Sequence, residues 1–217
     1  MKLFLNASRN EESFGRARVA QNDDLTAGRL ELSDTYLVAQ AGAGNVEAFA
    51  LLVERHTSAL YRVACRMLGD RLEAEDVVQE CFAKLWTSAP GWAPKGCGLV
   101  GWLHRVAMNL CLDRLRKPAP LVTDAFPDIE DLAPLQDRTI EGRQARLAIE
   151  SALEALPAHY RAALVLSYYE GFPNATASEA MEMNLKAFES LLVRARQHLR
   201  KLLETNGFHL ADLEVLP

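Results

Sequence analysis

Apolar residues recur at three- and four-residue steps through most of the chain between residues 33 and 204, and no stretch alternates with a period of two. This spacing predicts amphipathic helices and no β-strand, so the sequence predicts an all-α fold. Ser33 and Asn184 are expected to cap helices, and Gly42, Gly69 and Gly171 are expected to end them. The expected helices cover residues 33–42, 49–68, 76–86, 101–117, 143–156, 157–171, 174–181 and 184–204.

One segment interrupts the helical pattern. Residues 118–142 contain four prolines and show no hydrophobic periodicity, which is long for a connection inside a compact domain. We therefore expect two small helical domains, at 34–117 and 143–204, joined by a linker at 118–142. Residues 1–33 are expected to form a poorly ordered extension, and residues 205–217 a C-terminal tail.

The charge of the chain is distributed unevenly. Its net charge is −5, but segment 104–117 carries +3, segment 186–201 carries +4, and the expected linker between them carries −5. Because salt screens charges beyond roughly 8 Å, a polyanion responds to such local patches rather than to the total charge. A protein that binds nucleic acid can have this layout, and so can a protein whose charge runs are only solvated faces.

Composition and motifs exclude several classes of function. No run of 18 apolar residues is available to span a membrane, and the N-terminus turns polar too early for a secretory signal, so we expect a cytoplasmic protein. The four cysteines lack zinc-like spacing, and we expect three of them to be buried and Cys97 to be the most exposed. Phosphate-binding loops, HExxH and nucleophile elbows are missing, so the sequence predicts no enzyme, no cofactor and no metal site.

The stretch from Asp76 to Trp86 combines an apolar stripe with a polar surface. Asp76, Gln79 and Glu80 are spaced i, i+3 and i+4, so they lie on one side of a helix. From periodicity alone, this side is either the solvated face of a core helix or a surface that binds a partner.

The helix expected at 101–117 separates polar from apolar residues more sharply. At about 100° per residue, Leu103 and Ala107 fall on one side, whereas Arg105, Asn109, Asp113 and Arg116 fall on the other. Arginines and an amide on one face can hold phosphates and hydrogen-bond to base edges. An exposed face with a chance excess of arginine is the alternative.

Residues 174–204 have the outline of a helix–turn–helix, with a three-residue turn at 182–184. In the second helix a DNA-binding role would use the outer face, whose first residues reach the major groove. Short helix pairs also occur without DNA binding. The inward residues are expected to be Leu185, Phe188, Leu192, Ala195 and Leu199, and the outward ones Lys186, Ser190, Arg194, Gln197 and Lys201.

Together, three segments resemble the extracytoplasmic-function (ECF) σ factors, the two-domain branch of the σ70 family. The first is Asp76-Val77-Val78-Gln79-Glu80-x-Phe82-x-x-Leu85-Trp86. The second is Trp102-Leu103-x-Arg105-Val106-Ala107-x-Asn109-x-x-x-Asp113-Arg114-Leu115-Arg116. The third combines Ala155-Leu156-Pro157, Arg161, Tyr168-Tyr169-Glu170-Gly171 and Lys186-Ala187-x-Glu189-Ser190-Leu191-Leu192-x-Arg194-Ala195-Arg196.

The resemblance implies a non-enzymatic σ factor that binds core RNA polymerase through the β′ clamp and β flap, recognises promoter DNA in a stress response, and is controlled by an anti-σ factor. The implied polymerase-binding residues are Asp76, Gln79, Glu80, Phe82 and Trp86. The implied −10 residues are Arg105, Asn109, Asp113, Arg114, Arg116 and Lys117. The implied −35 residues are Lys186, Glu189, Ser190, Arg194 and Arg196.

The chain departs from the family pattern in its last domain. Glu182 occupies the turn where the family usually has glycine, and a left-handed backbone costs a residue with a Cβ on the order of 1 kcal/mol. Pro173, Thr176 and Ser178 also replace residues that are common in the family. Two other hypotheses are a DNA-binding regulator that uses only the helix–turn–helix, and an enzyme, which would need a convergent polar pocket.

Overall fold

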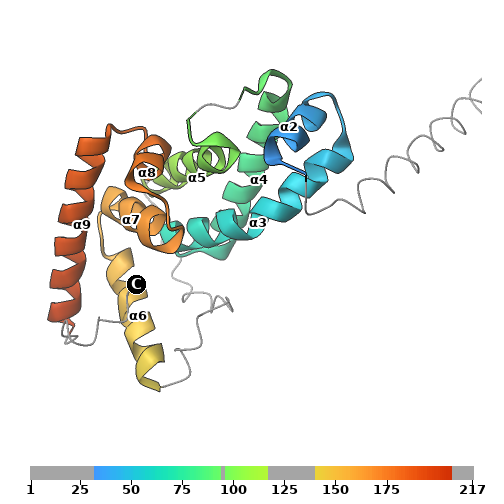
Figure 1. Ribbon diagram of the computed structural model, residues 1–217. Coiled ribbons are helices and arrows are strands. Elements are labelled where there is room, and N and C mark those ends of the chain that lie inside the picture. The colour runs from blue at the N-terminus through green and yellow to red at the C-terminus, as the bar shows by residue number, and fades with distance from the viewer. Residues whose placement is uncertain (1–31, 94–95, 117–139, 207–217) are drawn as a thin grey trace, which may run out of the picture. The chain divides into compact units, whose positions relative to one another are not determined.

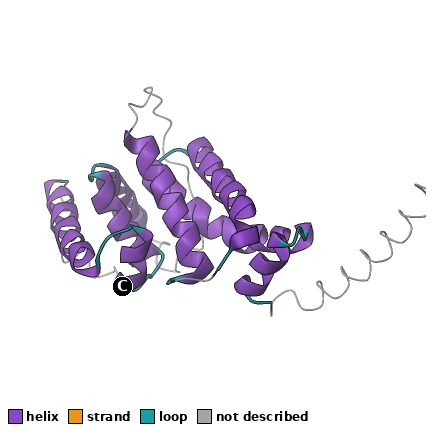
Figure 2. Cartoon of the chain, turned by 90° about the horizontal axis from the view of Figure 1, so that it is seen from above, coloured by secondary structure: helices purple, strands orange, loops and turns teal. Residues whose placement is uncertain are grey.

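The computed structural model of the protein describes residues 32–93, 96–116 and 140–206, and every regular element in these ranges is a helix (Figures 1 and 2). The prediction of an all-α fold is confirmed. Within the same ranges, no helix is both long and apolar enough to cross a membrane. Almost all of the expected extension and tail, and most of the expected linker, lie outside the described residues.

The elements follow one another along the chain as a series of helices and short helical turns. They are α2 (Asp34–Gly42), α3 (Val46–Leu68), α4 (Arg71–Ser88), the 3-10 turn η1 (Ala89–Gly91), α5 (Gly98–Arg116), α6 (Ile140–Glu154), α7 (Ala158–Leu164), the π-helical turn η3 (Val165–Tyr169), α8 (Asn174–Ala180) and α9 (Leu185–Thr205).

Side-chain caps begin two of the helices as the sequence predicts. The Ser33 side chain accepts a hydrogen bond from the backbone N–H of Tyr36, at 3.3 Å, and begins α2. Asn184 Oδ1 accepts one from the backbone N–H of Ala187, at 2.8 Å, and begins α9. Each acceptor satisfies one of the N–H groups that a helix start leaves unpaired. Both predicted caps are confirmed.

The described residues form two compact units, one with residues 32–55 and 86–92 and the other with residues 56–85, 93, 96–116 and 140–206. In the first unit α2 packs on η1, and a Cβ at Gly42 would lie 2.4 Å from the carbonyl oxygen of Ala89. Only a glycine allows this approach. The rings of Phe49 and Trp86 meet edge to face, with centroids 4.9 Å apart.

In the second unit, α5 packs against α8 and α7, and α7 and α8 both pack against α9. The unit therefore contains helices from both expected domains, and the domain division at 34–117 and 143–204 stays a prediction. Fully buried side chains include Leu103, Leu166 and Phe188. Leu185 was expected to face inward, but it is 43% exposed. It is the first residue of α9, and its side chain leans toward the N-terminus, past the end of the packed face.

The helix expected at 157–171 is not one continuous α-helix. After α7 the backbone widens into η3, where the N–H of Glu170 bonds to the carbonyl of Val165, at 3.1 Å. The N–H of Phe172 then bonds to the carbonyl of Leu166, at 3.0 Å. Such a wide turn has no simple sequence signal, and it rotates the residues that follow relative to an α-helix.

The buried Arg161 of α7 joins three helices. Its guanidinium donates to the carbonyl of Met67, near the end of α3, and to the carbonyl of Glu154, the last residue of α6. Carbonyls at helix C-termini have no partner within their own helix, and a positive charge is favourable there. Burial lowers the pKa of Arg161, and the nearby Glu154 carboxylate opposes that shift.

We predict that Arg161→Ala lowers the free energy of unfolding by about 2–3 kcal/mol, because one buried and one part-buried carbonyl at helix ends lose a charged donor. Urea unfolding of the full chain at neutral pH measures this loss. Arg200→Ala, which removes an exposed arginine of α9, is the control and is expected to change stability by less than about 0.5 kcal/mol. Equal stability of the two variants would contradict the structural role of Arg161.

We also predict that Asn184→Ala lowers the free energy of unfolding by about 1 kcal/mol, because α9 loses its N-terminal cap. Asn206→Ala is the matched control, since Asn206 lies at the other end of α9 and its contacts there come from its backbone N–H. Thermal unfolding followed by circular dichroism separates the two variants. A melting temperature that falls equally in both would show that the cap contributes nothing specific.

Candidate protein-binding and nucleic-acid-binding surfaces

Helix α4 carries its polar row on the side away from the core. Asp76, Gln79 and Glu80 are all exposed, as the spacing predicted. Phe82 is buried, so in this structure it supports the helix from beneath rather than extending the polar surface. Trp86 is 39% exposed. The exposed row therefore consists of two carboxylates and an amide above an apolar core.

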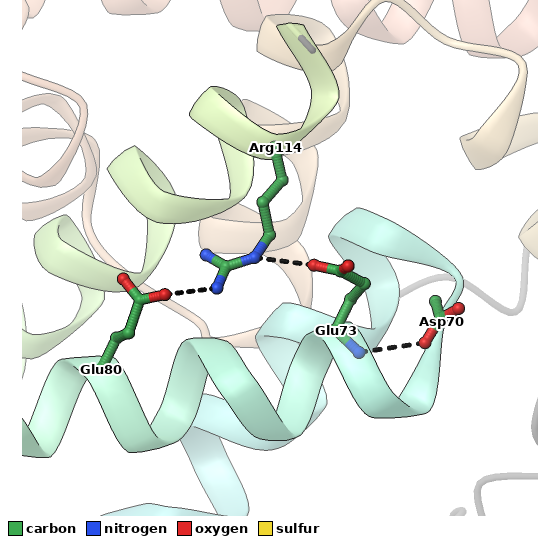
Figure 3. A network of polar contacts seen from close by, with 4 residues as sticks. All are labelled: Asp70, Glu73, Glu80 and Arg114. Atoms are coloured by element: carbon green, nitrogen blue, oxygen red, sulfur yellow. Dashed lines mark hydrogen bonds and ion pairs between the residues drawn. The ribbon is translucent and has the colours of Figure 1, made fainter. Parts of the chain in front are cut away.

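A network of charges ties α4 to α5 (Figure 3). Arg114 Nε donates to Glu73 Oε2 at 2.8 Å, and its Nη2 donates to Glu80 Oε1 at 2.6 Å. The Asp70 carboxylate accepts the backbone N–H of Glu73 at 3.0 Å and so begins the helix that carries both acids. Burial lowers the pKa of Arg114, but the hydrogen bonds and charges of Glu80 and Glu73 outweigh burial and raise it.

This network joins two residues that the sequence assigned to different partners. Glu80 was expected to bind polymerase and Arg114 to bind the −10 DNA, and the structure pairs them with each other. Arg114 therefore positions α5 against α4. Neither expected role is tested by this geometry, and both stay predictions.

The outer face of α5 is polar, as the helical wheel predicted. Arg105, Asn109, Asp113 and Arg116 are exposed, whereas Leu103, Ala107 and Leu110 are buried. Arg116 and Asp113 form an ion pair at 3.4 Å, which is weak because both side chains are well exposed. Lys117, also expected at the −10 element, lies outside the described residues.

Helices α8 and α9 form the expected helix–turn–helix. The turn contains Glu182 at φ +55°, so a residue with a Cβ does adopt the left-handed backbone that usually requires glycine. Ser178, one of the departures from the family, is buried and its hydroxyl donates to the carbonyl of Ala175 at 2.8 Å, which fits it into α8.

The outer face of α9 presents every residue expected at the −35 element. All five of them are exposed: Lys186, Glu189, Ser190, Arg194 and Arg196. The backbone of α9 accepts hydrogen bonds from the Ser190 hydroxyl at 2.9 Å and from Arg194 Nε at 3.2 Å. Arg196 Nη1 donates to the Tyr168 hydroxyl at 3.4 Å, across to η3.

No sequence motif marks the contacts that join α5 to the C-terminal helices. His104 Nε2 lies 3.3 Å from Glu170 Oε2, and these side chains are only 3% and 8% exposed. The ring of Phe172 packs edge to face on His104, with centroids 4.7 Å apart. His104 and Glu170 lie far apart in the sequence, and although Glu170 belongs to the third resembling segment, nothing in that segment pairs it with His104, so only the three-dimensional fold reveals the contact.

The cysteines follow the prediction from periodicity. Cys65, Cys81 and Cys111 are buried free thiols, and Cys97 is the most exposed of the four. Burial raises the pKa of Cys81 and of Cys111 to about 12, so both remain protonated at neutral pH. Among the described residues, no cluster of three or more His, Cys, Asp or Glu side chains could hold a metal ion.

Comparison with protein families matches two separate parts of the chain. The model described as Sigma-70 region 2 matches residues 52–119, and the model described as Sigma-70, region 4 matches residues 146–199. The first match includes the polar row of α4 and the outer face of α5. The second includes α7, α8 and most of α9.

Characterised relatives carry the same resemblance. The ECF RNA polymerase sigma factor SigE of Mycolicibacterium smegmatis is 34% identical over 165 residues, which are 74% of this chain and 63% of the relative, so the chain spans less than two thirds of its length. The ECF RNA polymerase sigma factor SigM of Mycobacterium tuberculosis is 34% identical over 176 residues, covering 81% of this chain and 87% of the relative.

Solved structures agree with the sequence matches. CnrH, solved in complex with the cytosolic domain of CnrY, superposes with a TM-score of 0.61 at 27% identity over 79% of this chain and 97% of that one. The sigma factor RpoE of Bartonella quintana, solved with the anti-sigma factor NepR, gives a TM-score of 0.53 at 25% identity over 71% and 93% of the two chains. The chain therefore belongs to the ECF σ factors of RNA polymerase, within the σ70 family.

Proposed function

We propose that this chain binds core RNA polymerase and directs it to promoters through two DNA contacts, one on α5 and one on α9. The observation that carries the proposal is the exposed row of Asp76, Gln79 and Glu80 on α4, held beside α5 by the Arg114 network. A regulator that needed only its helix–turn–helix would have no use for a partner-binding row on a separate helix.

The polar row suits a partner surface of basic and hydrogen-bonding groups. Its two carboxylates and one amide are exposed, and the residues beneath them are buried, so the row can be approached without rearranging the core. We assign it to the β′ clamp of polymerase, as the resemblance implies, and the C-terminal helices to the β flap. Trp86, which is 39% exposed, is part of the proposed contact.

We assign the −10 contact to the outer face of α5. Asn109 can hydrogen-bond to the edge of a base that has left the stack, and Arg105 and Arg116 can hold the neighbouring phosphates. Asp113 and Lys117 complete the assigned set. Arg114 is expected to act indirectly, because its guanidinium is already held by Glu73 and Glu80.

We assign the −35 contact to α9. Lys186, Glu189 and Ser190 lie in its first two turns, where a recognition helix meets base edges in the major groove. A carboxylate such as Glu189 accepts from the exocyclic amine of cytosine. Arg194 and Arg196 lie further along the helix and are assigned to phosphates.

The proposal extends to regulation and location. The RpoE structure contains an anti-sigma factor, and we propose that an anti-σ factor also binds this chain and releases it under stress. We further propose that the chain acts in the cytoplasm, where promoter DNA and polymerase meet, and that it catalyses no reaction itself.

Transcription in vitro tests the central claim. Purified core polymerase with this chain and fragmented genomic DNA of the source bacterium is expected to give discrete promoter-specific transcripts, whereas core polymerase alone gives none of them. The starts are mapped by sequencing the 5′ ends of the RNA. A transcript pattern equal to that of core polymerase alone would contradict the proposal.

A pair of variants separates polymerase binding from DNA recognition. Asp76→Ala with Gln79→Ala is expected to weaken binding to core polymerase at least tenfold, since two polar contacts worth about 1 kcal/mol each are lost. Asn109→Ala is expected to change −10 preference while core binding stays intact. Binding is measured by fluorescence anisotropy of the labelled chain.

Glu75→Ala is the matched control for the polymerase-binding variant, because Glu75 is also an exposed carboxylate on α4 and is turned about 100° from Asp76. It is expected to bind core polymerase like the unmodified chain. If the double variant keeps full core binding and the chain still binds duplex DNA, the regulator hypothesis is favoured instead.

A further inference from the structure

Arg114 reaches from α5 to α4, where two carboxylates about two helical turns apart hold its guanidinium (Figure 3). Glu73 accepts from Arg114 Nε at 2.8 Å, and Glu80 accepts from Arg114 Nη2 at 2.6 Å. The planar guanidinium suits this bridge, because its N–H groups point in fixed directions. A lysine has the same charge, but its ammonium is a compact group on a flexible stem and would not hold both acids in one geometry.

The surroundings of Arg114 are unfavourable for a DNA phosphate. The Arg114 side chain is only 19% exposed, whereas the neighbouring Glu73 and Glu80 side chains are 52% and 49% exposed. A phosphate that approached the guanidinium would meet these two carboxylates, and like charges repel one another. Arg116, by contrast, is 70% exposed on the same helix. Arg116 is therefore open to a phosphate, whereas Arg114 is shielded from one.

The bond from Arg114 also restricts a residue of the polymerase-binding row. Glu80 lies one turn after Asp76 in this row, at the i, i+4 spacing at which like charges repel. The positive charge of Arg114 offsets this repulsion, and its hydrogen bond limits the positions of the Glu80 carboxylate. The bond is made to Oε1, and a carboxylate has two oxygens with about four acceptor positions. Glu80 therefore keeps the capacity to accept from a partner.

We propose that Arg114 is a positioning residue for polymerase binding, which orients Glu80 before the partner arrives and does not itself contact DNA. This role rests on the proposed function, because it requires that the row on α4 meets polymerase. A side chain that is already ordered loses less conformational freedom on binding, so the orientation of Glu80 strengthens the contact. Arg114 thus acts with the polymerase-binding residues of α4, although the resemblance placed it among the −10 residues.

Binding to core polymerase tests the positioning role. Arg114→Lys keeps the positive charge and removes the planar, branched geometry. It is expected to weaken core binding about fivefold, the effect of one further side chain that must be ordered on binding. Arg71→Lys makes the same exchange at an exposed arginine of α4, and this matched control is expected to bind like the unmodified chain. Fluorescence anisotropy of the labelled full chain measures both affinities.

A double-mutant cycle shows whether Arg114 acts through Glu80. Glu80→Ala is expected to weaken core binding by itself, and Arg114→Lys is then expected to add less than about a twofold loss. A general loosening of α5 from α4 would instead weaken binding by the same factor with and without Glu80. Equal factors in the two backgrounds, or an unchanged affinity of Arg114→Lys alone, would overturn the proposal.

The salt dependence of DNA binding tests whether Arg114 contacts a phosphate. Holoenzyme is assembled with an excess of each variant chain, and its affinity for a promoter mapped by transcription is measured over a range of salt concentrations. Arg116→Gln is expected to reduce the slope of log affinity against log salt by about 0.7, the value for one phosphate of a single strand. Arg114→Gln is expected to leave the slope unchanged. A reduction as large as that of Arg116→Gln would overturn the proposal.

Failure of the positioning role and failure of the proposed function give different results. If the unmodified chain does not bind core polymerase, the proposed function falls, and the positioning role falls with it. If the unmodified chain binds and Glu80→Ala weakens that binding while Arg114→Lys does not, the proposed function stands and only the positioning role is overturned.

Discussion

The guanidinium of Arg161 donates hydrogen bonds to a carbonyl near the end of α3 and to a carbonyl at the end of α6. The arrangement of the second compact unit depends on this contact. It brings the ends of α3 and α6 so close that a Cβ at Gly69 would lie 2.6 Å from Glu154 Oε1. Arg161 Nε is buried without a hydrogen-bond partner, so this buried charge depends on the two carbonyls, and neither helix end can move away without leaving a further guanidinium nitrogen unpaired. The contacts of Arg161 therefore hold α7 and the end of α6 against the end of α3.

The π-helical turn η3 builds on that arrangement. By widening the backbone after α7, it directs Tyr169 to the guanidinium of Arg66, which lies 4.2 Å from the ring centroid, and Glu170 to His104. Burial raises the pKa of Tyr169, so its hydroxyl stays neutral beside the arginine. Departures from α-helical geometry often occur at functional positions. Here the departure forms the surface that meets α3 and α5.

The sequence was sufficient to predict features that depend on neighbouring residues. It could not predict contacts between residues that lie far apart in the chain. The caps at Ser33 and Asn184 and the buried cysteines follow from propensity and periodicity, and the structure confirms them. Periodicity also located the exposed faces of α4, α5 and α9. Periodicity could not show that Arg114 pairs with Glu73 and Glu80, because the position of an arginine in the sequence does not indicate which carboxylate it will contact in the fold. Nor could it predict η3.

Glu182 departs from the family pattern, and its contacts show what this departure contributes to the structure. In the sequence it is only a cost, since the turn prefers glycine, whereas the structure adds the gain of an ion pair with Arg105. The strain costs about 1 kcal/mol, and an ion pair this exposed contributes at most about 1 kcal/mol, so the pair offsets part of the strain. The strain is confined to the turn itself, whereas the ion pair joins the turn to α5 and adds to the packing of α5 against α8.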